Sequence, residues 1–168
     1  MIVTPAYVIE MAAYNTWQNN GLCRVVQAMD EVDVRADRGA FFGSIFGTLN
    51  HLLWGDLLWM SRFDGGPAQS SVIADSAAFT ATVSQWADQR TSVDVRISKW
   101  AAGVTASDLS GDLTWFSGSL NAEVAKPKAT CITHFFNHQT HHRGQLHAML
   151  TAAGQTPDAT DLVFMPKD

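Results

Sequence analysis

Four of the six histidines of this chain fall within one short segment, HFFNHQTHHRGQ, at residues 134–145. If the segment is helical, His134, His138 and His142 advance by only about 40° each and share one side of the helix. Histidines at positions i and i+4 lie on adjacent turns, where both rings can bind one divalent metal ion. His138 and His142 have this spacing, so the segment predicts part of a metal site. His141 is expected to lie away from His142 in space.

A third ligand has to come from another element, and His51, in TLNHLLWGD, is the histidine outside the last helical segment. A lone histidine on an apolar face is more often a hydrogen-bonded core residue than a ligand. The repeated HxxxH spacing elsewhere in the chain favours the metal site. Three neutral imidazoles leave one coordination position for water, as in catalytic zinc sites. An ion held there lowers the pKa of bound water towards about 7, or removes the proton of a bound thiol or hydroxyl.

Several other polar side chains are candidates for the surroundings of this site. Gln145 falls on the ligand side of the helix. His134 has three interpretations, a metal ligand, a group that orients a ligand and a donor to a backbone carbonyl, of which the second is favoured. Arg143 is expected to form a salt bridge, with Asp56 as the proposed partner. No glutamate accompanies the histidine pair in an HExxH arrangement, so Asp56 and Glu10 are the candidates for a general base.

A further group of side chains has both a site interpretation and a structural one. Four aromatic residues either wall a pocket above the metal or belong to the ordinary core: Tyr14, Trp17, Trp54 and Trp59. Three asparagines are polar contacts of the site or unrelated helix residues: Asn15, Asn50 and Asn137. Cys131 is either a soft metal ligand or a small buried residue.

Four long helices have to position these residues. The first is expected at about 4–29, with Thr4 as N-cap and Pro5 at the first helical position. The second is expected at 44–63, where Ser44 caps its start and the DGGP sequence at 64–67 stops it.

The third and fourth helices follow from apolar periodicity. The third opens at Asp75 or Ser76, and Arg90 interrupts once the seam formed by Phe79, Val83, Trp86, Val93, Ile97 and Trp100. The fourth begins near Pro127 or Thr130 and ends where Gly154 can adopt a left-handed cap.

Between the last two helices, residues 113–116 and 123–125 have modest strand character around an SGS turn, which predicts a small hairpin or extended arm. The connections between helices exceed the two to eight residues of simple up-down bundles, so one or two crossovers are expected. The fold class is therefore all-α, a four-helix bundle. Its length of 168 residues predicts a single domain over 1–168.

Composition excludes several classes of protein. The net charge of −5 comes without a cluster of Lys and Arg, so nucleic acid is not an expected partner. The two cysteines, Cys23 and Cys131, form no CxxC motif, which favours a reduced compartment. There is no signal-like leader and no run of 18 apolar residues, so we expect a cytoplasmic protein that does not enter membranes.

Three motifs resemble those of the DinB family, within the wider DinB/YfiT-like superfamily of metalloenzymes. They are YNTWQNN at 14–20, NHLLWGDLLWMSRF at 50–63 and HFFNHQTHHRGQ at 134–145, so the resemblance covers nearly the whole chain. It implies a four-helix bundle of mixed up-and-down order, often dimeric, that binds a divalent metal such as zinc or nickel through three histidines. By motif these are His51, His138 and His142.

The resemblance also implies a function. Characterised relatives in the superfamily include thiol-dependent S-transferases and maleylpyruvate isomerase, so the first hypothesis is a transferase or isomerase that uses a low-molecular-weight thiol. A metal-dependent hydrolase is the alternative enzyme, in which bound water is the nucleophile. A hypothesis of another class is a non-catalytic metal-binding bundle. A small-molecule substrate and a homodimer are the expected partners.

Overall fold

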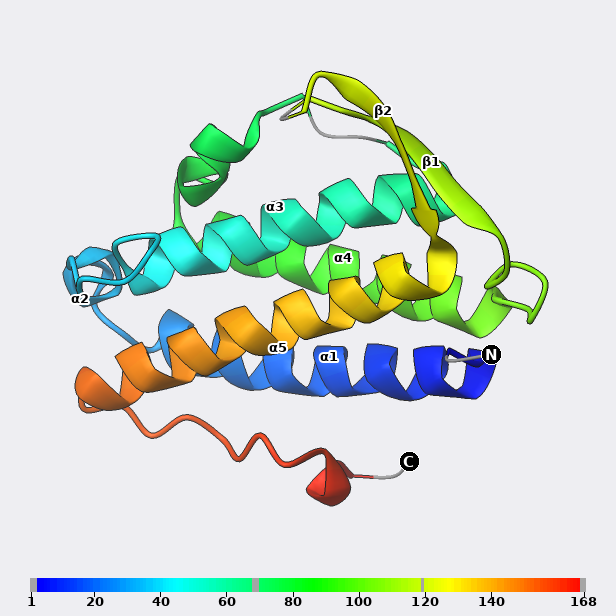
Figure 1. Ribbon diagram of the computed structural model, residues 1–168. Helices are drawn as coiled ribbons and strands as arrows, with labels where there is room; N and C mark the ends of the chain where they lie inside the picture. Colours follow the sequence, from blue (N-terminus) through cyan, green and yellow to red (C-terminus); the bar gives the residue numbers. More distant parts are fainter. Residues whose placement is uncertain (1–2, 68–69, 119, 167–168) are drawn as a thin grey trace.

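The computed structural model describes residues 3–67, 70–118 and 120–166, and most of these residues are helical (Figure 1). Four long helices lie side by side: α1 (Pro5–Gln27), α3 (Ile45–Asp64), α4 (Val83–Gly103) and α5 (Lys128–Ala152). Helix α3 packs against α4 and α5, and α1 packs against the same two helices. In Figure 1, α3 and α4 run in one direction, whereas α1 and α5 run in the other.

The ends of three long helices confirm the predictions made from capping residues. The Thr4 hydroxyl accepts a hydrogen bond from the Tyr7 amide at 3.2 Å, and the Ser44 hydroxyl accepts one from the Gly47 amide at 3.0 Å. Each hydroxyl satisfies an amide that has no partner within its helix. Gly65 (φ +68°) ends α3 and Gly154 (φ +76°) follows α5, both in the left-handed region that glycine adopts without strain.

Two short helices lie in segments interpreted as connectors or as part of the third helix. Helix α2 (Glu31–Arg35) occupies the connector after α1, and the 3-10 helix η1 (Ile73–Ala78) precedes α4. A second 3-10 helix, η2 (Leu162–Phe164), lies near the C-terminus.

The prediction that the third helix opens at Asp75 or Ser76 was wrong, because α4 begins at Val83. The Asn50 side chain accepts a hydrogen bond from the Thr80 amide at 3.1 Å and donates to the carbonyls of Ala77 and Thr80. The backbone that would continue the helix is thereby bonded to α3. The Thr82 hydroxyl then accepts from the Gln85 amide at 3.1 Å and starts α4.

The predicted hairpin is present and longer than expected. Strands β1 (Asp112–Ser117) and β2 (Ala122–Pro127) pair antiparallel, with Asp112 opposite Pro127 and Ser117 opposite Ala122. Ser119, the last residue of the predicted SGS turn, lies outside the described residues. The half-buried side chains of β1 alternate along the strand, and the hairpin arches over the C-terminal part of α3 (Figure 1).

The core lies between the four long helices and is built from large apolar side chains of each of them. Fully buried examples include Val26, Leu49, Leu53, Trp86, Ile97, Phe135, Phe136, Leu146 and Leu150. Within the part of the chain that is described, no helix combines the length and apolar character needed to cross a bilayer.

Candidate metal centre

Side chains from α3 and α5 bring three histidine nitrogens together. The Nε2 atom of His138 lies 3.2 Å from Nε2 of His51 and 3.1 Å from Nε2 of His142. All three ligand atoms lie within 4.8 Å of one another, and His51 and His142 are buried. We call these three residues the histidine cluster. No fourth His, Cys, Asp or Glu joins the group among the described residues.

Two of the three nitrogen separations in the cluster match those around a shared metal ion, and the third pair lies within 4.8 Å. Two imidazole nitrogens bound to one tetrahedral ion at about 2.0–2.1 Å are roughly 3.3 Å apart. The two Nε2 separations of 3.1 and 3.2 Å come close to that value. A neutral imidazole has one N–H, so His138 can donate a hydrogen bond to one of its neighbours but not to both. A cation bound by all three lone pairs removes this conflict.

Hydrogen bonds on the opposite ring nitrogens orient two of the three imidazoles. The Nδ1 atom of His142 lies 2.8 Å from Oε1 of Gln145, while Nε2 of Gln145 lies 3.1 Å from Nε2 of His141. The amide oxygen only accepts, so Nδ1 of His142 carries the proton and Nε2 presents its lone pair. Nδ1 of His51 similarly lies 2.9 Å from the Ser76 hydroxyl of η1.

Burial keeps the cluster neutral at physiological pH. Burial, together with the smaller effect of nearby His142, lowers the pKa of His138 to about 3 and that of His51 to about 4. Burial also lowers the pKa of His142, against the effect of its hydrogen bond to Gln145. Neutral imidazoles are the form that binds a metal, so the rings need not lose a proton at pH 7.

Aromatic rings cover one side of the cluster. Phe42 stacks on His51 with ring centroids 3.8 Å apart and meets the His142 ring edge-on at 5.5 Å. Trp54 stacks near His51 at 6.1 Å and is buried. Phe42 was not among the candidate residues, because it lies in the connector before α3, where no periodic pattern indicates which side chains point inward.

Gly55 allows α5 to approach α3 at the cluster. A Cβ atom at this position would lie 3.0 Å from Cε1 of His138, closer than ordinary van der Waals contact. Gly55 follows His51 by one helical turn, so the same face of α3 supplies one ligand and makes room for another. The helix therefore tolerates a glycine in its interior because a larger residue would displace the His138 ring.

Comparison with known families was consistent with these motifs. The family model of the DinB family matches residues 1–167. The chain belongs to the DinB family. It is 21% identical over 165 residues to Protein DinB of Bacillus subtilis (strain 168), and the match covers 96% of this chain and 96% of that one. The family match includes both helices that carry the histidine cluster.

Two further histidines of the DinB motif lie beside the cluster. His134 is next to His138, with ring centroids 5.8 Å apart, and its other side meets Trp59 at 5.1 Å. His134 makes no hydrogen bond to a cluster histidine among the described residues. The groups that hydrogen-bond to His51 and His142 are Ser76 and Gln145. His141 was expected to lie away from His142, which was wrong: the rings are 4.8 Å apart and Gln145 bonds to both.

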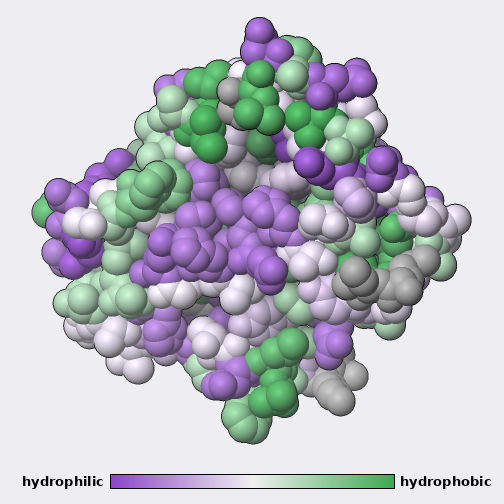
Figure 2. All heavy atoms as spheres, in the orientation of Figure 1, coloured by the Kyte–Doolittle hydropathy of each residue, from purple (hydrophilic) through white to green (hydrophobic). Residues whose placement is uncertain are grey.

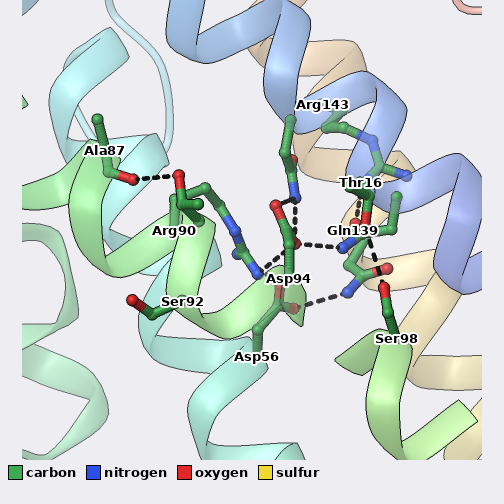
Figure 3. A network of polar contacts seen from close by, with 12 residues as sticks. Thr16, Asp56, Ala87, Arg90, Ser92, Asp94, Ser98, Gln139 and Arg143 are labelled. Carbon is green, nitrogen blue, oxygen red and sulfur yellow. Dashed lines mark hydrogen bonds and ion pairs between the residues drawn. The ribbon is translucent and has the colours of Figure 1, made fainter. Parts of the chain in front are cut away.

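The prediction that Arg143 pairs with Asp56 was also wrong. Asp56 is fully buried and its two oxygens accept from Arg90 at 2.7 Å and from Gln139 at 3.0 Å (Figure 3). Arg143 instead donates to the Asn15 side chain. The ion-pair partner of Asp56 is therefore Arg90, the residue that interrupts the apolar seam of α4, and sequence analysis did not identify it.

These residues belong to one ionic network that ties the four long helices together. Arg90 also donates to Asp94 at 2.8 Å, and Asp94 accepts from Asn15 and Asn19, each at 3.0 Å. The ionic network consists of Asn15, Asn19, Asp56, Arg90, Asp94, Gln139 and Arg143, all of them buried. Burial raises the pKa of the Asp56 carboxyl, and the Arg90 guanidinium acts against that rise. With both oxygens engaged, Asp56 is not placed to act as a general base.

The remaining candidates lie away from the cluster or support it indirectly. Glu10 and Asn137 are exposed, and Asn50 holds the segment that carries Ser76. Cys131 is buried and is not part of the histidine group. Of the four aromatic candidates, Trp54 and Trp59 contact cluster histidines or His134, whereas Tyr14 and Trp17 pack against each other, and the Tyr14 hydroxyl donates to the Thr160 carbonyl.

The α5 face that carries the histidines is polar. Figure 2 shows hydrophilic side chains gathered over α5, with apolar side chains above them on the hairpin and on the segment around η1. Val72, Ile73 and Phe116 are exposed members of the apolar group, with 61%, 59% and 66% of their surface accessible. The cluster thus lies at the rim of the core, beside a surface with both polar and apolar character.

Proposed function

We propose that this DinB-family chain is a divalent-metal-dependent enzyme in which His51, His138 and His142 hold the ion. The observation that carries the proposal is the convergence of three neutral Nε2 atoms, with neighbours 3.1 and 3.2 Å apart. Three imidazole ligands suit zinc or nickel, and they leave a coordination position for a substrate or cosubstrate. Ser76 and Gln145 would keep two of the rings in the ligating orientation.

The favoured reaction is transfer or isomerisation that uses a low-molecular-weight thiol. A bound divalent ion supplies the acidity that converts a thiol to a thiolate at neutral pH. This chemistry suits a site without a free carboxylate base: Asp56 is held by Arg90 and Gln139, and Glu10 is exposed. Phe42 and Trp54 would limit the access of water to one side of the site.

Two other functions share the same histidines. In a hydrolase, bound water would replace the thiol as nucleophile. In a non-catalytic bundle, the ion would only tie α3 to α5. We favour the enzyme because no fourth His, Cys, Asp or Glu of the described residues joins the three histidines.

We further propose the wider setting of this activity. The helix directions and the long connection from residue 65 to residue 82 support a bundle of mixed up-and-down topology with a crossover between α3 and α4. A single domain over 1–168, a homodimeric assembly, a cytoplasmic location and a small-molecule substrate complete the proposal, with no nucleic-acid or membrane partner.

Metal analysis tests the ligand set. Purified wild-type protein is expected to retain one divalent ion per chain, and His51→Ala and His142→Ala are each expected to lose it. His147→Ala is the matched control, because His147 lies on the same helix outside the cluster. Retention of the ion in either cluster variant would remove that residue from the proposed set.

A thiol screen then tests the reaction. Metal-loaded wild-type protein is supplied with an electrophilic acceptor and several low-molecular-weight thiols, and product is followed by mass spectrometry. Thiol adduct that requires the ion supports the transferase; hydrolysed acceptor without thiol adduct would support the hydrolase. Metal binding without either product would favour the non-catalytic bundle.

A further inference from the structure

A second concave site lies away from the histidine cluster, near the C-terminal ends of α3 and α4. It is a cavity of about 640 Å³, within the size range of small-molecule sites. Its apolar lining includes Phe63, Trp100, Leu113 and Ile132, which come from α3, α4, β1 and α5. Arg62 on its wall follows His51 by eleven residues of α3, about 16 Å along the helix axis. None of the three cluster histidines lines it.

This cavity is basic although the chain is acidic. Four of the eleven Lys and Arg residues line it, namely Arg62, Arg96, Lys99 and Lys128, against only two of the sixteen Asp and Glu residues, Asp64 and Asp108. Arg96 is engaged by Asp64 through two hydrogen bonds of 2.7 and 2.8 Å. Hydrogen bonds from Thr105 lower the pKa of Asp108, and the charge of Lys128 lowers it further. Arg62, Lys99 and Lys128 have no salt bridge among the described residues.

Arg62 is held in place by aromatic rings instead of by a carboxylate. Its guanidinium carbon lies 4.6 Å from the centre of the Trp59 ring and 4.8 Å from that of Trp115, which faces it from the hairpin. The side chain is half-buried, and burial lowers its pKa. It makes no hydrogen bond to any described residue. A guanidinium held by aromatic rings, without a hydrogen bond to the chain, has N–H groups available for a planar anion.

We propose that this cavity binds a small-molecule carboxylate with an apolar body, and that Arg62 binds the carboxylate. The fork of the guanidinium matches a carboxylate in two parallel hydrogen bonds, Lys99 adds positive charge, and Phe63, Trp100 and Leu113 accommodate the apolar part. The site does not depend on the metal or on the reaction proposed above. Trp59 contacts both Arg62 on the cavity wall and His134, the neighbour of the cluster residue His138.

The test compares 4-phenylbutyrate with 4-phenylbutanamide, which has the same apolar body without the charge. Binding to the full chain is measured by calorimetry at low salt with EDTA present, so that no metal ion can bind the carboxylate. Indole N–H resonances of Trp100 and Trp115 report the location. The carboxylate is expected to shift both resonances and to bind at least about tenfold more tightly than the amide, because charge-assisted hydrogen bonds have that effect.

Two variants and a control make the assignment specific. Arg62→Gln is expected to weaken carboxylate binding about tenfold to a hundredfold and to leave amide binding unchanged. The control is Arg24→Gln. Arg24 is an exposed residue of α1 that pairs with Asp158, and the variant is expected to bind both probes as the wild type does. Leu113→Trp keeps Arg62 and fills the cavity, so it is expected to abolish binding even if Arg62→Gln fails to fold.

Several results would overturn the proposal. They are equal affinity for the two probes, binding of neither, shifts confined to other tryptophans, unchanged carboxylate affinity in folded Arg62→Gln, or full affinity in folded Leu113→Trp. Metal binding by the histidine cluster is measured separately, so failure here leaves the proposed enzyme standing, and loss of metal binding leaves this cavity standing.

Discussion

Two polar regions lie side by side in this protein and are built on opposite principles. In the ionic network, Arg90 lies between Asp56 and Asp94 at 2.7 and 2.8 Å, and each buried charge meets an opposite charge or an amide. In the histidine cluster, three neutral imidazole rings point their nitrogen atoms toward one another. The carboxylates of the network are neutralised by the chain's own arginine, although four buried network atoms have no hydrogen-bond partner among the described residues, namely Asn19 Oδ1, Arg90 Nε, Gln139 Oε1 and Arg143 Nη2. The cluster presents neutral lone pairs that a cation would bind.

This contrast separates a structural role from a chemical one. Residues of all four long helices contribute to the network, so its loss should disturb the fold whether or not a metal is bound. The cluster joins only α3 and α5, and its rings are held from behind by Ser76 and Gln145. We therefore expect network variants to change stability and cluster variants to change metal affinity.

The largest effect is expected from Asp56→Ala in the network. The substitution leaves the Arg90 guanidinium buried with one of its two carboxylates gone, and breaking a buried pair costs about 3–5 kcal/mol. Urea unfolding in EDTA measures the loss of unfolding free energy. Asp88→Ala, on the exposed face of the same α4 helix as Arg90, should change it by less than about 0.5 kcal/mol. Equal effects of the two variants would show that the network is not a structural requirement.

His138→Ala is expected to have the complementary effect. In wild-type protein, metal at a hundred times its dissociation constant should raise the unfolding free energy by about 2.7 kcal/mol, because the ion binds only the folded state. The variant removes the nitrogen that faces both others, so added metal should give no such increase, while unfolding in EDTA stays near the wild-type value. A large loss in EDTA would mean that the cluster is structural after all.

Gln145→Ala tests the groups that orient the ligands. Without the amide oxygen, Nδ1 of His142 loses its acceptor at 2.8 Å, and the ring no longer has a preferred tautomer. Loss of such a partner typically weakens metal binding tenfold to a hundredfold, about 1.4–2.7 kcal/mol. Competition with a chelating dye measures the affinity. Ser76→Ala should behave similarly through His51; Gln155→Ala, beyond the end of α5, serves as the control.

The pH dependence of stability should come from the cluster, with a sign that follows from its pKa values. His51 and His138 have pKa values of about 4 and 3 in the folded chain and 6.5 when unfolded. Their contribution is present in full above pH 6.5 and is lost as the pH falls towards 4 and 3, because the unfolded chain binds protons first. Solvent reduces the effect at His138, whose side chain is half-buried. Metal-free wild type is expected to lose more stability between pH 7 and pH 5 than the variant with both histidines replaced by glutamine.

Much of the fold, and the placement of His138 and His142 on one helix face, followed from sequence because they depend on local spacing. The i+4 spacing of His138 and His142 places two rings on one helix face, and Thr4, Ser44, Gly65 and Gly154 mark helix ends through local backbone chemistry. These features need no knowledge of how helices pack.

The parts that sequence reasoning missed depend on packing. Ser76 reaches His51 only because Asn50 bonds to the backbone near Thr80 and shortens the third helix. In the sequence, Arg90 only interrupts an apolar seam. Its role becomes clear when the packing of α3 on α4 places Asp56 next to it. The basic cavity was invisible for the same reason, because its four cations are separated in the chain and meet only at the ends of the helices.

Gly55→Ala is expected to have the smallest effects, and they have opposite signs: a gain in folding stability and a loss of metal affinity. The variant therefore separates the structural role of α3 from its role at the histidine cluster. Alanine is a better helix former than glycine by about 1 kcal/mol, so unfolding in EDTA should require slightly more urea. The added Cβ lies 3.0 Å from Cε1 of His138 and displaces the ring by a few tenths of an ångström, so metal binding should weaken. Gly103→Ala, near the end of α4 with no atom within 4 Å of the new Cβ, controls for helix propensity alone. If Gly55→Ala gained stability and kept full metal affinity, the close approach of α3 to His138 would have no part in forming the site.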